Sequence, residues 1–451
     1  MIPYIRTQIR RLFTDNTPII RMFRNAGWLF GGDALTMGIG AVQGILIARF
    51  LGADAYGILG LVITYTLFVN QLVDSRVWET VIKFVTQFRE QGESAKATAV
   101  IKLSYLIDLS TGTVAFALVL LTAPLAASLF IKSGGSTPVI RLFALSVLVA
   151  IPRDTSTAVL RVNGCFRWLA IQNSSEAILR FAGILLVLLT KGSITQILVV
   201  YLAASTIGTL ILLGMVYAIR QEAGIARLTA VPLRTLLPHQ REIGSFLLAT
   251  NLNALLKMVR NSDILLLGYL FVPAQVGYYR IARQFAQFIN LPVNPIYSAS
   301  FPEFATLWHQ KEMQILKRAI KRVVQLASAI ALTGGAVLFL FGKWILVLAV
   351  TDAYLPALPV LRWLAAGTAV AVATSSLRPL LLAAGKANKL TTASIAGIAA
   401  QFTLIIILAP KWHIAAAGAG YLAFYLVWIA ICLLSFWQAW QTQQKEGHEP
   451  D

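Results

Sequence analysis

Basic and amide side chains recur on one face of an apolar segment near residue 280. Arg280, Arg283, Gln284 and Gln287 are spaced i, i+3, i+4 and i+7, which aligns them along one face of a helix. A guanidinium presents its donors as a planar fork that matches the oxygens of a carboxylate or a phosphate. The stripe therefore predicts recognition of an anion.

A second polar stripe occupies the preceding apolar segment, where Asn253, Lys257 and Arg260 lie three to four residues apart. Lys257, Arg280 and Arg283 have no acid at pairing distance along their own helices. Either acids of the other half of the chain neutralise them, or they line a water-filled space. The surplus of positive charge fits a pyrophosphate group, which we expect Lys257, Arg260, Arg280 and Arg283 to hold. Three further arginines in apolar segments are expected to add to the positive electrostatic potential at this site: Arg76, Arg153 and Arg378.

Carboxylates in apolar segments are concentrated in the first half of the chain. They are Asp33, Asp74, Glu79, Asp108, Asp154 and Glu176, whereas the second half has Asp263. Helical spacing allows three local ion pairs: Arg76 with Glu79, Glu176 with Arg180, and Arg260 with Asp263. From the acidic surplus we expect a coupling site for a proton or a sodium ion at Asp33, Asp74, Glu79 or Asp154.

The elements that must position these residues follow from the composition. The chain has 451 residues, of which 57% are hydrophobic and 13% charged, whereas a soluble domain is usually about 25% charged. Apolar runs long enough to cross a bilayer as helices recur along the whole chain, and the short alternating strands of a barrel are absent. The sequence predicts an all-α polytopic membrane protein with twelve transmembrane helices. Their approximate spans are 26–50, 57–82, 100–131, 138–162, 168–190, 194–219, 244–271, 275–299, 320–349, 357–384, 388–410 and 414–440.

Loop charges predict the orientation of these helices. Lysine and arginine gather in the loops on the side of the N-terminus, for example at Arg10, Lys96, Arg227 and Lys321, so both termini are predicted to be cytoplasmic. The net charge of +19 is explained by these loops and does not imply a nucleic-acid partner. The cysteines and histidines are too scattered to predict a disulfide or a metal site, and no cleavable signal peptide is evident.

Two short motifs indicate an internal repeat. The hairpin "LGADAYG" corresponds to "FVPAQVG", and "LRVNGCFRWLA" corresponds to "LLAAGKANKLT". The matched glycines, Gly57 with Gly277 and Gly164 with Gly385, are 220 and 221 residues apart. We therefore predict two parallel six-helix lobes, with a substrate path between them. The predicted parts are a basic amphipathic arm 1–25, lobes 26–219 and 244–440, a cytoplasmic linker 220–243 and a tail 441–451.

The segments "ARFLGADAYG" and "NSDILLLGYLFVPAQVGYY" resemble those of polysaccharide-biosynthesis flippases of the O-antigen type, in the multidrug/oligosaccharidyl-lipid/polysaccharide exporter superfamily. The resemblance implies a V-shaped, two-lobed transporter of the bacterial inner membrane that works by alternating access. The implied substrate is an undecaprenyl-pyrophosphate-linked oligosaccharide, which would be moved to the outer leaflet. A glycan polymerase and glycosyltransferases are the implied partners, besides membrane lipids.

Other functions remain as alternatives. A multidrug cation antiporter of the same superfamily would need acids to attract cations, against the basic surplus of the second half. A lipid II flippase is closer in chemistry, but such relatives typically have fourteen crossings. A glycan polymerase or ligase would need a large external loop with catalytic groups, and the external connections are short. We predict no catalytic residues, no enzyme activity and no cofactor, apart from coupling to a proton or sodium gradient or to the membrane potential.

Overall fold

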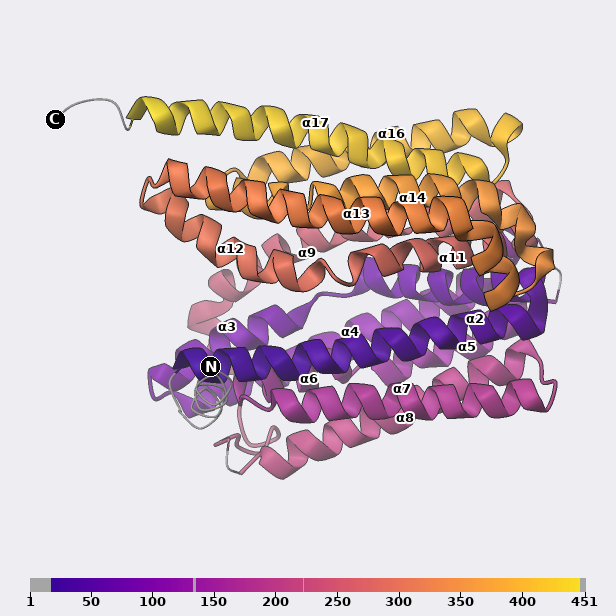
Figure 1. The fold of residues 1–451 in the computed structure, drawn as a ribbon. Coiled ribbons are helices and arrows are strands. Elements are labelled where there is room, and N and C mark those ends of the chain that lie inside the picture. Colours follow the sequence, from indigo (N-terminus) through magenta and orange to yellow (C-terminus); the bar gives the residue numbers. More distant parts are fainter. Residues whose placement is uncertain (1–17, 133–134, 222, 447–451) are drawn as a thin grey trace, which may run out of the picture. The chain divides into compact units, whose positions relative to one another are not determined.

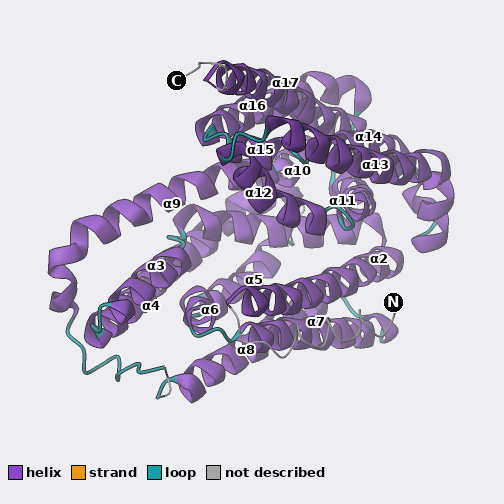
Figure 2. Ribbon diagram, turned by 60° about the vertical axis from the view of Figure 1, so that its left-hand side comes forward, coloured by secondary structure: helices purple, strands orange, loops and turns teal. Residues whose placement is uncertain are grey.

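The computed structural model describes residues 18–132, 135–221 and 223–446. Within these ranges the chain is helical, with turns and short loops but no strand (Figure 2). This confirms the all-α prediction. Most of the arm 1–25 and the end of the tail 441–451 lie outside the described residues.

Contacts divide the chain into two compact units. The first unit contains residues 1–44, 65–127 and 133–255, and the second contains 45–64, 128–132 and 256–451. Element α2 (Pro18–Val73) therefore contributes to both, and it consists of two helices that meet at Gly52, whose φ of 80° is not helical. Glycine tolerates this backbone conformation because it has no Cβ. The predicted lobe boundaries remain a prediction.

The first unit is built from one set of consecutive helices. These are α3 (Val77–Glu90), α4 (Ser94–Ala126), α5 (Thr137–Ala150), α6 (Arg153–Val162), α7 (Phe166–Leu189), α8 (Ile194–Ile219), the 3₁₀ turn η2 (Leu233–His239) and most of α9 (Gln240–Asn261).

The second unit holds a corresponding set. These are most of the π-turn η1 (Ala127–Ile131), α10 (Asp263–Leu270), α11 (Pro273–Gln287), η3 (Phe288–Asn290), α12 (Asn294–His309), α13 (Met313–Ala349), η4 (Asp352–Ala357), α14 (Leu358–Ala373), α15 (Leu377–Ala383), α16 (Ala387–Trp412) and α17 (Ala415–Glu446).

Helix packing inside the two units follows one pattern. In the first unit α3 packs on α4 and α6, α4 on α5, and α8 on α5, α6 and α7. In the second unit α12 packs on α13 and α15, α13 on α14, and α17 on α14, α15 and α16. The pairs α7–α8 and α16–α17 can be followed in Figure 1. The same six positions therefore recur in the same chain order, which confirms the predicted internal repeat.

Helix ends show the repeat residue by residue. At Gly164 the backbone has φ +72° and donates to Arg161 O, while Cys165 donates to Leu160 O. At Gly385 the backbone has φ +70° and donates to Leu382 O, and the next residue donates to Leu381 O. Both ends are Schellman caps, in which a left-handed residue satisfies the last carbonyls of a helix. The glycine pair predicted from sequence thus has one structural role.

A further pair of helix ends was invisible to the sequence comparison. Helix α3 ends in the same type of cap at Gly92, and α12 ends in it at Lys311, which has φ +58°. These residues are separated by nearly the offset of the other pairs. Because one of the two positions is a lysine, residue identity did not reveal that these helix ends correspond. They nevertheless share the left-handed backbone conformation.

Nine helices or helix pairs among the described residues are long and apolar enough to span a membrane. The first, Gly31–Val73, has 43 residues and would be about 65 Å long if straight, roughly twice the hydrocarbon thickness. Its break at Gly52 separates two of the predicted spans. The predicted spans 244–271 and 275–299 are not among these nine, and α11, within the second of them, has only 15 residues. A total of twelve crossings stays a prediction.

The predicted linker packs against the first unit. Ile225, Val231 and Leu236 are buried in a core with Phe84 and Phe88 of α3. Two basic side chains form hydrogen bonds to the backbone of this linker: Arg89 Nη2 donates to Ala223 O at 3.0 Å, and Lys102 Nζ donates to Val231 O at 2.9 Å.

Candidate functional site

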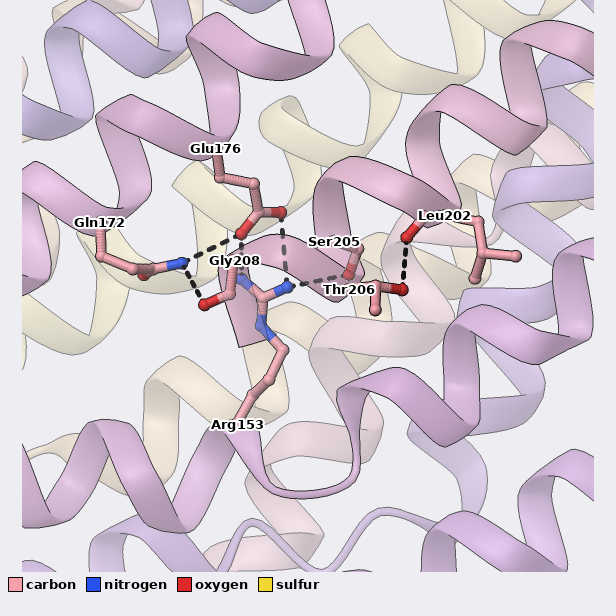
Figure 3. Close-up of polar contacts among 7 residues, drawn as sticks. All are labelled: Arg153, Gln172, Glu176, Leu202, Ser205, Thr206 and Gly208. Atoms are coloured by element: carbon pink, nitrogen blue, oxygen red, sulfur yellow. Dashed lines mark hydrogen bonds and ion pairs between the residues drawn. The ribbon is translucent and has the colours of Figure 1, made fainter. Parts of the chain in front are cut away.

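A polar network inside the first unit is centred on an ion pair between Arg153 and Glu176 (Figure 3). Arg153 is the first residue of α6, directly after Pro152, and Glu176 lies on α7. Their closest atoms, Nη2 and Oε2, are 2.5 Å apart, and Arg153 Nη1 also donates to Ser205 Oγ on α8 at 2.9 Å. The side chains are only 24% and 12% exposed. The pair therefore ties three helices together in a poorly solvated place.

Gly208 and Gln172 complete this network. Gln172 Nε2 donates to Glu176 Oε2 at 3.1 Å and to Gly208 O at 3.2 Å. A Cβ on Gly208 would collide with the Glu176 carboxylate, so the glycine makes the approach of α7 to α8 possible. The neighbouring Thr206 donates to Leu202 O of its own helix and adds nothing to the network (Figure 3).

Glu176 is therefore not the partner of Arg180, although the i,i+4 spacing allowed that pairing. Arg180 Nε instead donates to Gln43 Oε1 at 3.4 Å, and its guanidinium lies 5.2 Å from the centre of the Tyr201 ring. Gln43 Nε2 in turn donates to Tyr201 Oη at 2.6 Å. Tertiary packing decides the partner because it brings Arg153, from another helix, closer to the carboxylate.

A carboxylate lies at the N-terminus of α6. Asp108 of α4 is 6% exposed and accepts a hydrogen bond from Thr155 Oγ1 at 2.6 Å and a longer one from Thr155 N at 3.4 Å. The first turn of a helix offers free N–H groups and the positive end of the helix dipole, both of which favour an anion. Asp154 is in the same turn, half-buried and without a salt bridge to any side chain that the structure describes.

Arg76 and Glu79 form the ion pair predicted from their spacing, with Arg76 Nη2 3.1 Å from Glu79 Oε1. Arg76 has a φ of 42°, and its backbone N–H donates to Asp74 Oδ1 at 3.1 Å. Two guanidinium groups lie near the Trp78 ring, that of Arg76 at 5.7 Å and that of Arg161 at 5.3 Å from its centre. Asp74 and Glu79, both predicted coupling residues, are therefore engaged by Arg76.

In the second unit, Asp263 is the partner of Arg283. Arg283 Nη1 lies 2.6 Å and 2.8 Å from the two carboxylate oxygens, and Tyr279 Oη donates to Asp263 Oδ2 at 2.5 Å. Asp263 is 1% exposed and is the first residue of α10. The pair joins α10 to α11. The absence of an acid along the helix of Arg283 thus did not leave this cation unpaired.

Arg280, one turn earlier on α11, contacts the α2 segment of the same unit. Its Nη1 donates to Tyr56 O at 2.5 Å, and its guanidinium lies 4.3 Å from the centre of the Tyr56 ring. Tyr56 Oη donates to Gln284 Oε1 at 3.2 Å. A Cβ at Gly60 would collide with Arg280, so the glycine provides room for the guanidinium. No carboxylate among the described side chains neutralises Arg280.

The other predicted residues are spread over the fold. Lys257 and Arg260 lie on α9, but their side chains are outside the described residues. Arg378 on α15 and Asp33 on α2 are exposed. Arg378 forms no ion pair with a described carboxylate. The structure therefore places Arg280 and Arg283 together on α11, while Arg76, Arg153 and Arg378 occupy separate sites within their own units.

The charge asymmetry persists after pairing. In the first unit Arg153 and Arg76 pair with Glu176 and Glu79. In the apolar segments of that unit this leaves four acids without a salt bridge among described side chains, Asp33, Asp74, Asp108 and Asp154, against one cation, Arg180. In the second unit Arg283 takes Asp263, which leaves Arg280 and Arg378 without a carboxylate. No group of three His, Cys, Asp or Glu side chains that could hold a metal ion occurs in the described part of the chain.

Sequence reasoning missed several members of these networks. Gln172 precedes Glu176 by four residues, a spacing that could have indicated it. Tyr279, Ser205 and Tyr56 gave no such signal, because a single hydroxyl beside apolar residues is common. Their roles depend on contacts between segments far apart in the chain.

Comparison with known proteins agrees with this fold. The solved structure of a multidrug resistance MATE family transporter of the MOP superfamily, in an inward-facing conformation, is similar with a TM-score of 0.76 and 14% identity, covering 92% of this chain and 96% of that one. The lipid II flippase MurJ, in an inward closed conformation, is similar with a TM-score of 0.70 and 14% identity, covering 94% and 93%. At these identities the likeness concerns the fold alone.

Sequence comparisons are more specific. Inner membrane protein YghQ of Escherichia coli strain K12 is 19% identical over 300 residues, which are 66% of this chain and 84% of that protein. The profile of a family described as polysaccharide biosynthesis protein matches residues 22–308, more than half of the chain. The repeated helical fold, the apolar spans and this match lead to one conclusion: the chain belongs to the polysaccharide biosynthesis protein family.

Proposed function

We infer that this protein is a flippase of the bacterial inner membrane, with both termini in the cytoplasm. It moves undecaprenyl-pyrophosphate-linked oligosaccharide units to the outer leaflet by alternating access, for the synthesis of cell-surface polysaccharide. The family match over residues 22–308 is the observation that carries this proposal. The proposed partners are the enzymes that build and polymerise the glycan, and no catalytic step is assigned to this chain.

The arrangement of charges supports an anionic substrate. Arg280 lies within the apolar second unit, and its partners are a carbonyl oxygen and an aromatic ring rather than a carboxylate. Arg280 is half-buried, and a cation in an apolar helical unit without a counter-ion is costly, so such a residue is expected to serve a substrate. We assign binding of the pyrophosphate to Arg280 and Arg283, together with Lys257 and Arg260. Three further arginines add to the positive electrostatic potential: Arg76, Arg153 and Arg378. Arg283 would have to exchange its bond to Asp263 for the substrate.

The acids of the first unit suggest how transport is driven. Asp33, Asp74, Glu79 and Asp154 remain our candidates for binding a proton or a sodium ion. Asp154 is the strongest of them, because it is half-buried and lacks a salt bridge among described side chains, whereas Glu79 is paired with Arg76. Binding of a cation there would bias one conformation over the other.

The test is translocation in proteoliposomes made with the full-length protein. Undecaprenyl-pyrophosphate-linked oligosaccharide is loaded on one side, and its arrival on the other is measured with an added glycosidase. We expect Arg280→Ala to abolish arrival and Arg280→Lys to retain part of it, because lysine keeps the charge but not the fork. Arg362→Ala is the control, since this exposed arginine stacks on Phe339 and is not in the assigned site.

Two other outcomes would replace the proposal. Transport of organic cations without glycolipid transport would identify a multidrug antiporter. Preference for lipid II over the polymer repeat unit would identify a lipid II flippase. Thermal unfolding of each variant shows whether a loss of transport reflects a loss of folded protein.

A further inference from the structure

An apolar cavity lies within the second unit, beside the break between α11 and α12. Its volume is about 690 Å³. Phe288, Ile289 and Pro292 form one wall, and Ala329, Thr333 and Val337 of α13 belong to the other. Thr333 is the only polar side chain among the described lining residues, and it donates to Ala329 O at 2.7 Å. The described side chains of its wall therefore offer the cavity no free hydrogen-bond donor.

The break in the helix explains why the cavity exists. Helix α11 ends at Gln287, and the chain continues through the 3₁₀ turn of η3 to Pro292 before α12 begins at Asn294. Proline has no N–H and cannot continue a helix without a kink. Ile289 lies 3.2 Å from the place where a Cβ on Gly334 would be, so the glycine allows close approach at this point. The interruption leaves the adjoining surface of α13 uncovered.

The dimensions match an extended hydrocarbon chain. The α13 residues that line the cavity run from Ala329 to Ile345, a rise of about 24 Å along the helix. This is most of the roughly 30 Å thickness of the hydrocarbon layer. The volume is more than four times the roughly 150 Å³ of a cavity that holds one benzene molecule, so several five-carbon isoprene units fit.

The basic edge of α13 and the polar stripe of α11 both continue beyond the cavity wall and indicate an anionic lipid. Arg322 precedes Ala329 by two helical turns and Arg318 precedes it by three, so both lie along the edge of α13 that Ala329 and Thr333 occupy. Both arginines are exposed, and neither forms an ion pair with a described carboxylate. Along the other wall, Phe288 lies one turn beyond Gln284, and therefore beside the polar stripe that contains Arg280.

We propose that this cavity is the groove for the polyprenyl tail of the substrate, a proposal that rests on the proposed function. The apolar walls hold isoprene units, and Arg318 and Arg322 attract the diphosphate at one end. An ordinary phospholipid keeps its headgroup at the membrane surface, so its headgroup would not contact a polar stripe inside the membrane. A polyprenyl diphosphate must carry its headgroup through the membrane while the tail stays in hydrocarbon, and a groove that borders the stripe of α11 suits this task.

Photocrosslinking tests the assignment in proteoliposomes of the full-length protein. The probe is undecaprenyl pyrophosphate with a diazirine in its tail, and phosphatidylglycerol with a diazirine in one acyl chain is used for comparison. Val337→Trp fills the groove. Leu332→Trp is the matched control, because Leu332 is also exposed on α13 but lies on nearly the opposite face. Ala329→Phe is a second filling variant, should Val337→Trp reduce the amount of folded protein.

The expected result is crosslinking of the polyprenyl probe to peptides containing residues 285–293 or 329–338. We expect Val337→Trp and Ala329→Phe to lower this yield about tenfold, equivalent to about 1.4 kcal/mol of binding, with little change for Leu332→Trp. Crosslinking elsewhere, or equal yields for Val337→Trp and Leu332→Trp, would overturn the proposal. An equal loss for both probes would show a general acyl-chain groove and would also overturn it.

Failure of the groove and failure of the function can be told apart. If the wild-type protein translocates no polyprenyl-linked oligosaccharide, the proposed function fails. If it translocates the substrate and the filling variants behave like Leu332→Trp, the function stands and the groove assignment alone is wrong.

Discussion

Gly57 and Gly277, the residues that first indicated the repeat, each contact the segment that contains the other. A Cβ on Gly57 would collide with the carbonyl of Pro273 and lie 3.1 Å from the backbone nitrogen of Gly277. A Cβ on Gly277 would collide with the carbonyl of Ala53. Both residues belong to the second compact unit. The segments around Gly57 and Gly277, which are equivalent in the two repeats, are therefore in backbone contact. Glycine is needed at both positions because a Cβ would meet a peptide group, which cannot move away as a flexible side chain can.

Substituting either glycine should force these segments apart. We expect Gly57→Ala and Gly277→Ala each to lower the free energy of unfolding by about 1–3 kcal/mol, as overpacking does. Gly40→Ala is the control, since Gly40 is also on α2 and a Cβ there meets nothing within 4 Å. Titration with a denaturing detergent would measure the change. Equal stability of all three variants would contradict the close contact.

The repeat and the helical class were accessible from sequence because they depend on hydropathy and on glycines with special backbone demands. Gly164 and Gly385 were matched by identity, and the structure gives both a left-handed cap. Lys311 has the same conformation as Gly92 but could not be found, since a lysine can be held in this conformation by surrounding contacts. The two helices of α2 meet at Gly52, and the glycine of the "LGADAYG" motif together with hydropathy placed the two predicted spans that it separates.

The ion pairs were only partly predictable. Spacing along one helix gave Arg76 with Glu79, because i,i+3 neighbours meet whatever the tertiary fold. Spacing failed for Glu176, which is reached by Arg153 from another helix. For Asp263, spacing along one helix gave no sign of Arg283, which reaches it from α11. Contacts between helices depend on how the helices pack, and the spacing of residues along one helix does not indicate that packing.

The Arg153–Glu176 pair should behave as a coupled unit. Removing one partner leaves an unpaired charge in a poorly solvated place, so Arg153→Met and Glu176→Gln are each expected to cost up to about 3–5 kcal/mol of stability. The double variant should cost less than the sum of the two. Unfolding measurements on all three variants form a double-mutant cycle.

The pair between Lys96 and Glu93 is the reference for that cycle. It is more exposed, at 27% and 39%, so Lys96→Ala should cost less than about 1 kcal/mol. Additive losses at Arg153 and Glu176 would show that the contact in Figure 3 carries no coupling.

The buried cluster of Asp263, Tyr279 and Arg283 should show a graded response. Tyr279→Phe removes one hydroxyl and its hydrogen bond, and we expect a loss of about 1–2 kcal/mol. Asp263→Ala removes the counter-ion of Arg283 and should cost about 3–5 kcal/mol. Thermal unfolding would rank the two variants, and a larger loss for Tyr279→Phe would contradict the central place of the carboxylate.

Asp154 provides the sharpest test of ion coupling. Asparagine has nearly the same shape but cannot take up a proton or balance a sodium ion, so Asp154→Asn should make translocation insensitive to the gradient that drives the wild type. The measurement compares rates in proteoliposomes with an imposed proton gradient, a sodium gradient or neither. Asp108→Asn is the matched control, because Asp108 is engaged by Thr155 and is expected to act in packing. If wild-type transport ignores both gradients, no acid of the first unit couples an ion. If Asp154→Asn retains the wild-type response, the coupling residue lies elsewhere, with Asp33 and Asp74 next to be substituted.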